Sequence, residues 1–198
     1  MNFDPQQIMA LLTATSFAAG LNVYATVATL GLLGRYHVLP LPHGLEVMTH
    51  GPVIAVALVL FVIECFADKI PYFDLVWNLL HTFVRIPVAA LIAWNATAQL
   101  SPEMQMAATV LGGSIALVAH TGKTAVRAGV TPSPEPFSNF ALSTAEDVGA
   151  IALTWLATRH PHTAGAVALV CVVASFVVAR WIVRSLRGVW KELKEGWA

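Results

Sequence analysis

The 198-residue chain consists mainly of apolar residues, which make up 57% of it against 11% charged residues. Its mean hydropathy is +0.70, whereas soluble globular domains carry about a quarter charged residues. The composition therefore predicts an integral membrane protein. The formal net charge is zero and no basic patch is interleaved with aromatic residues, so nucleic acid is excluded as a predicted partner.

The first apolar segment begins at Asp4-Pro5, a typical helix cap and first helical residue, and continues to about Leu33. A helix of this length would extend about 43 Å, whereas the hydrocarbon core of a bilayer is about 30 Å thick. We therefore expect a tilted, kinked or broken helix, with the break at Gly20-Leu21-Asn22. Either a packing kink beside small residues or a binding site that includes Asn22 would explain such a break.

Five further apolar segments bring the predicted total to six transmembrane helices, so the predicted fold class is an all-α membrane bundle. Their expected bounds are Pro52 to about Pro71, Arg85 to Ala98, Pro102 to Thr121, Ser143 to Thr158 and Thr163 to Val183. Residues 1–183 are assigned to one transmembrane domain and residues 184–198 to a cytoplasmic amphipathic tail. The N-terminus has no Lys or Arg ahead of the first apolar segment, so no signal-peptide cleavage is expected.

The distribution of Lys and Arg residues predicts the orientation, because cytoplasmic loops are enriched in them. With both termini in the cytoplasm, only Arg35 and Arg159 of the 11 basic residues fall outside. The basic residues assigned to the cytoplasmic side are Lys69, Arg85, Lys123, Arg127, Arg180, Arg184, Arg187, Lys191 and Lys194.

Two segments, 72–84 and 128–143, are predicted to dip into the membrane from the cytoplasmic side. Arg85 and Glu146 each precede a tryptophan, Trp94 or Trp155, by nine residues. If the tryptophans lie in the outer aromatic belt, nine helical residues place both charges about 14 Å deeper, near the middle of the bilayer. The preceding segments would then fill the other half of the bilayer as re-entrant elements, and the matching spacing suggests a tandem hairpin repeat.

The predicted central site consists of Arg85, Glu146 and Asp147. A cation near the start of a membrane helix needs a carboxylate partner, and Asp68, Glu146 or Asp147 could supply it. Two structural alternatives stay open. Glu146 could belong to a capping box with Ser143, and the Arg85 ion pair could lock the two hairpins together without any transport.

A polar pathway to this site is predicted from residues spaced four apart. Glu64 and Asp68 share one helix face, and Lys123 and Arg127 share another. The residues expected to line the pathway are Glu64, Asp68, Lys69, His120, Lys123 and Arg127. The alternative is that these charges extend to the cytoplasmic interface.

The sequence predicts neither a metal site, a cofactor nor an enzymatic activity. Five histidines, His37, His43, His50, His160 and His162, fall in the two predicted outer loops, but their spacing matches no standard ligand pattern. The chain also contains no phosphate-binding glycine loop, nucleophile elbow or HExxH sequence.

Three motifs resemble a known family: Gly20-Leu21-Asn22-Val23-Tyr24, Phe66-Ala67-Asp68-Lys69-Ile70-Pro71 and Ser143-Thr144-Ala145-Glu146-Asp147-Val148. They resemble a domain-of-unknown-function family of small bacterial integral membrane proteins. The resemblance spans nearly the whole chain and implies the bacterial inner membrane, with no activity or substrate attached. The predicted re-entrant segments with opposed charges are also similar to those of DedA-type lipid transporters.

These predictions favour a small inner-membrane transporter or permease for a lipid-linked or small polar substrate, with proton coupling left open. The alternative is a membrane scaffold whose basic tail, Arg180 to Ala198, binds anionic lipid or a partner. Membrane lipids are the expected partners, and homo-oligomerisation is left open.

Overall fold

The structure is a computed structural model that describes residues 3–70, 73–130 and 136–195. In these ranges the chain is all-helical, with seven α-helices and one short 3₁₀ helix, η1, and without a β-strand. The elements in chain order are α1 (Pro5–Leu21), α2 (Val23–Arg35), η1 (His43–Thr49), α3 (Gly51–Ala67), α4 (Phe73–Ala96), α5 (Pro102–Val130), α6 (Pro136–Arg159) and α7 (Pro161–Glu195).

The first apolar segment is broken at Asn22, as predicted. The side chain of Asp4 caps α1, and Pro5 occupies the first turn. Asn22 has an extended backbone conformation (φ −149°, ψ 104°) and caps both helices. Its N–H donates to Ala18 O at 2.9 Å, and its side-chain oxygen accepts the N–H of Ala25 at 2.9 Å. Each of these two bonds satisfies a backbone group that the break would otherwise leave unpaired.

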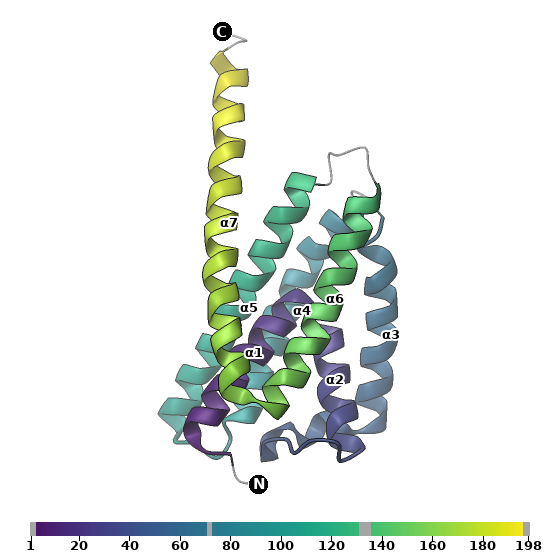
Figure 1. The fold of residues 1–198 in the computed structure, drawn as a ribbon, viewed down its shortest axis with the longest axis vertical. Coiled ribbons are helices and arrows are strands. Elements are labelled where there is room, and N and C mark those ends of the chain that lie inside the picture. Colours follow the sequence, from purple (N-terminus) through teal and green to yellow (C-terminus); the bar gives the residue numbers. More distant parts are fainter. Residues whose placement is uncertain (1–2, 71–72, 131–135, 196–198) are drawn as a thin grey trace.

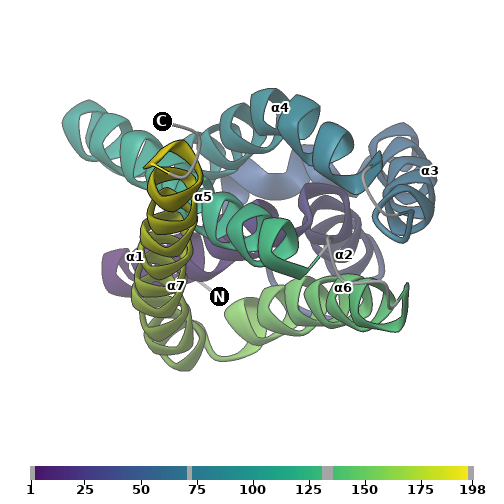
Figure 2. The same ribbon diagram turned by 90° about the horizontal axis from the view of Figure 1, so that it is seen from above.

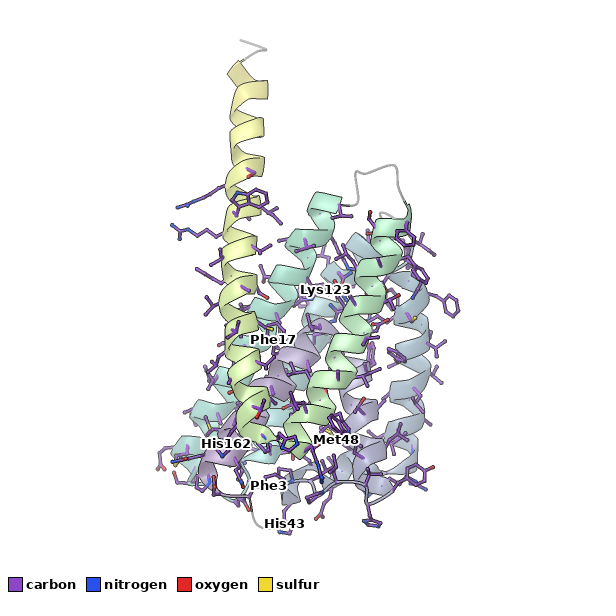
Figure 3. The ribbon with its side chains drawn as sticks, in the orientation of Figure 1. Phe3, Phe17, His43, Met48, Lys123 and His162 are labelled. Atoms are coloured by element: carbon purple, nitrogen blue, oxygen red, sulfur yellow. The ribbon has the colours of Figure 1, made fainter. Side chains whose placement is uncertain are left out.

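The break reverses the chain direction, so α1 and α2 form a hairpin with its tip at Asn22 (Figure 1). The open ends of the hairpin lie at the N-terminal end of the bundle, where Phe3, His43 and His162 are found (Figure 3). Two close approaches agree with this arrangement. A Cβ on Gly165, at the start of α7, would lie 3.0 Å from Ala10 Cβ, and a Cβ on Gly31 of α2 would lie 2.5 Å from Met48 O.

Helices α3 to α7 run alternately along the long axis of the bundle, and α7 continues well beyond the others (Figure 1). Helix α5 packs against α1, α4 and α7, whereas α3 stands at the edge of the bundle (Figure 2). Small residues permit the central contacts, because a Cβ on Gly20 would lie 2.6 Å from Ala116 O. Such close backbone approach is typical of helix interfaces in membranes.

Three helices of the described chain are long and apolar enough to cross a membrane: Val76–Ala96, Pro102–Val130 and Pro161–Ser185. A fourth crossing results if η1 and α3, which are bent by 68° relative to each other, count as one span. The predicted membrane protein is supported, whereas the predicted count of six spans is not confirmed.

The predicted re-entrant segments are not confirmed either. Residues 73–84 form the first half of α4, residues 128–130 end α5, and residues 136–143 form the first two turns of α6. Tyr72 and residues 131–135 lie outside the described residues. The predicted boundary at residue 184 falls within α7, which is helical from Pro161 to Glu195.

The predicted placement of both termini on the cytoplasmic side is not confirmed. The N-terminus and the C-terminus lie at opposite ends of the bundle (Figure 1). The prediction assumed that the first apolar segment crosses the membrane once, whereas the hairpin at Asn22 returns α2 toward the end of the bundle at which α1 begins.

Candidate functional site

The tip of the α1–α2 hairpin reaches a cluster of charged side chains inside the bundle, and Lys123 marks its position in Figure 3. Its members come from α3, from Asp68 directly after α3, and from α4, α5 and α6. Glu64, Arg85 and Arg127 have no exposed surface, and Asp68 and Lys123 are 1% and 4% exposed. We call this the charge cluster, and it consists of Glu64, Asp68, Arg85, His120, Lys123, Arg127, Glu146 and Asp147.

One half of the charge cluster is organised around Arg85 of α4. Its guanidinium pairs with Glu64 of α3 and donates a 2.9 Å hydrogen bond to Asn78 Oδ1. It also lies 2.7 Å from Nδ1 of His120. Because a guanidinium can only donate, Nδ1 accepts, and Nε2 then carries the proton toward Thr82 Oγ1, 2.7 Å away.

The other half of the charge cluster is organised around two cations of α5. Lys123 Nζ lies 2.8 Å from Asp68, 3.2 Å from Glu146 and 3.6 Å from Glu64. Arg127 lies 3.1 Å from Asp68 and pairs with Glu146. Lys123 therefore joins the two halves, since it contacts the Glu64 that also pairs with Arg85.

The two ends of the broken helix present opposite charge to this network. The C-terminal carbonyl of α1, Leu21 O, accepts a 3.0 Å hydrogen bond from Lys123 Nζ. At the N-terminus of α2, Asn22 Nδ2 donates to Asp147 Oδ1 at 2.8 Å. This polarity follows the helix dipole, whose C-terminal end attracts cations and whose N-terminal end attracts anions.

The described side chains of the charge cluster do not balance in formal charge. They comprise the carboxylates of Glu64, Asp68, Glu146 and Asp147 and the cations of Arg85, Lys123 and Arg127. Among the described side chains, no cation lies within 4.0 Å of Asp147. Desolvating an ion costs several kcal/mol. Protonation removes most of this cost at a carboxylate that has no paired cation.

Two small cavities flank the charge cluster. One of about 250 Å³ lies between α5, α6 and α7 and is lined by Lys123 and Glu146 among mainly apolar side chains. The other, of about 310 Å³, lies between α4, α5 and α7 and reaches His120 and Thr82. The two cavities therefore border the network on two sides of α5.

The structure brings together nine of the ten predicted site residues, because Asn22 joins the charge cluster through Asp147. Lys69 is the exception. Its Nζ donates to Cys65 O at 2.8 Å, lies 2.9 Å from Cys65 Sγ, and sits 5.2 Å from the centre of the Phe140 ring.

Two details of the predicted site are corrected. Arg85 pairs with Glu64, which was not among the three carboxylates expected as possible partners, Asp68, Glu146 and Asp147. Ser143 and Glu146 do not form a capping box, because α6 begins at Pro136 and both residues lie within the helix. Glu146 instead pairs with Arg127.

The sequence prediction missed the polar residues of α4. Asn78 bridges Asp68 and Arg85, and Thr82 contacts His120. The spacing of four and seven residues from Asn78 to Thr82 and Arg85 places all three on one helix face, and this pattern was the available signal. The described residues hold no group of three His, Cys, Asp or Glu side chains suited to a metal ion.

Residues 9–181 match a protein family described as a domain of unknown function, DUF4126. The chain belongs to this family. No curated protein and no solved structure matches this DUF4126 chain, so the similarity to DedA-type transporters is not shown. The matched range includes every residue of the charge cluster.

Proposed function

We propose that this protein is a small proton-coupled membrane transporter whose central site is the charge cluster. The observation that carries the proposal is the meeting of a broken helix with buried charges of both signs. Discontinuous helices of this kind, with their ends directed at charged groups in mid-membrane, form the substrate and ion sites of many secondary transporters. Buried intramembrane charges are costly and mark such pathways.

In this proposal, α3 to α7 cross the membrane and the α1–α2 hairpin enters it from one side without crossing. The C-terminal end of the bundle faces the cytoplasm, because Lys69, Arg180 and Arg184 lie there, whereas Arg35 and Arg159 lie at the N-terminal end. The proposed location is the bacterial inner membrane.

The substrate combines a polar or charged group with an apolar part, as a lipid-linked or small amphipathic molecule does. This assignment is supported by the 250 Å³ cavity, which has Lys123 and Glu146 on one wall and residues such as Val126, Leu142 and Val178 on the others. A polar group would exchange with part of the ion-pair network, and the apolar walls would accept the remainder.

The experiment uses the full chain in liposomes that contain a pH-sensitive dye. They are exposed to panels of amino acids, organic acids and amines, and separately tested for translocation of fluorescent phospholipids. Substrate-dependent proton flux is expected, and both Glu146→Gln and Arg85→Gln should abolish it. Arg159→Gln, an exposed residue at the other end of α6, is the matched control and should leave the flux unchanged. Full flux in both cluster variants would refute the proposal.

A scaffold function is the second candidate, and the projecting α7 is the observation that favours it (Figure 1). Arg180, Trp181 and Arg184 of this helix are exposed. Deleting residues 191–198 distinguishes the two functions, because a scaffold would lose binding to vesicles of anionic lipid, whereas a transporter would retain most of its flux.

A further inference from the structure

Helix α6 carries a row of buried polar side chains that leads to the charge cluster. Asn139, Ser143 and Asp147 follow one another at intervals of four residues and therefore lie on one helix face. They are 2%, 0% and 6% exposed. The row begins in the first turns of α6, at the C-terminal end of the bundle, and extends about 12 Å inward to Asp147.

Two members of this row have polar side-chain atoms without a partner in the part of the chain that the structure describes. Neither the side-chain nitrogen nor the oxygen of Asn139 has a hydrogen-bond partner among the described residues, and the same holds for Ser143 Oγ. A helical hydroxyl ordinarily donates to the carbonyl four residues earlier, as neighbouring Thr144 does to Phe140 O at 2.9 Å. Buried polar atoms in proteins are nearly always satisfied by protein or ordered water, so this row is suited to hold water.

The row ends at the least compensated carboxylate of the charge cluster. Asp147 accepts a hydrogen bond from the neutral amide of Asn22, and Lys123 is the cation that acts on it most strongly, while Glu64 and Asp68 repel it. Arg127 and Glu146 pair with each other beside it. Helix α1 contributes no ionisable side chain. The side chains of α7 that line the adjacent cavity are Ala174, Ser175 and Val178.

We propose that Asp147 is the proton-binding group of this protein and that water along Asn139 and Ser143 connects it to the C-terminal end of the bundle. A hydronium ion at the end of the row transfers its proton to the Asp147 carboxylate, which leaves a water molecule and a neutral carboxylic acid. The excess negative charge of the described cluster is thereby removed. The proton site is inferred independently of the proposed function. Only its role as the site of the coupling ion rests on that function.

The first test measures water access and does not depend on transport. In a Cys65→Ala/Cys171→Ala background, Ser143→Cys and Ala150→Cys are exposed to a charged, membrane-impermeant methanethiosulfonate reagent in nanodiscs. Both positions are fully buried, but Ala150 lies beyond Asp147 on α6. Because the reagent requires a hydrated thiolate, Ser143→Cys should react about tenfold faster or more. Equal rates at the two positions would show a dry row and overturn the proposal.

The second test follows the proton on Asp147 by infrared spectroscopy of the same full-length protein. A protonated-carboxyl band should grow as the pH falls, and the component contributed by Asp147 should be missing from the spectrum of Asp147→Asn. Asn22→Ser retains a helix-capping oxygen but removes the amide that donates to Asp147, so the titration midpoint of this band should move upward. A pH-dependent spectrum that is the same in Asp147→Asn as in the unaltered protein, or a midpoint of the Asp147 component unchanged in Asn22→Ser, would overturn the proposal. A protein that passes both tests but carries no flux would refute the transporter and retain the proton site.

Discussion

At the scale of single residues, Arg85 and Glu64 form an ion pair in which both side chains are fully buried. Replacing Arg85 with Gln leaves a fully buried carboxylate with less compensation, and breaking such a pair costs about 3–5 kcal/mol. Arg85→Gln should therefore lower the free energy of unfolding in detergent far more than Arg159→Gln. The double variant Glu64→Gln/Arg85→Gln should be more stable than the sum of its single changes predicts, and strict additivity would contradict the pairing.

Spacing along the sequence predicted most members of the charge cluster but not their partners. Residues four apart share a helix face, which grouped Glu64 with Asp68 and Lys123 with Arg127. Which carboxylate meets which cation depends on the relative height of α3, α4 and α5, and no local pattern encodes that height. The S-x-x-E motif at Ser143 indicated a wrong start for the helix, because it is a purely local pattern. Helix α6 begins seven residues earlier, at Pro136.

At the scale of elements, the hairpin depends on the close crossing of α1 and α5 at Gly20. A Cβ there would lie 2.6 Å from both Ala116 O and Ala119 Cβ. Neither atom can move away unless the backbone of α5 moves with it. Gly20→Ala should destabilise the protein by about 1–3 kcal/mol despite the better helix propensity of alanine. Gly129→Ala, with nothing within 4 Å of the new Cβ, is the matched control and should be neutral or slightly stabilising. Thermal unfolding in detergent compares them, and equal stability would contradict the crossing.

The length of the first apolar segment predicted its break, but hydropathy has no direction and could not predict the turn back. A kink and a hairpin differ in the backbone angles of one residue and in the neighbours that receive the second helix. Asn22 supplies the angles, and η1 and α3 receive α2. The continuous helix at residues 73–84 was missed because its apolar surface indicates only contact with lipid, which re-entrant and spanning segments share.

At the scale of the whole molecule, the hairpin separates the two termini and gives a prediction about topology. If α3 to α7 cross the membrane and the hairpin enters it from one side, as proposed above, tags at the N- and C-termini should lie on opposite faces of the membrane. In the proposed orientation, the C-terminal end, which carries the excess of Lys and Arg, faces the cytoplasm. Antibody binding to each tag, measured in sealed right-side-out and inverted vesicles, should therefore give complementary results. Binding of both tags in the same vesicles would contradict the hairpin and restore a topology in which the first segment crosses the membrane.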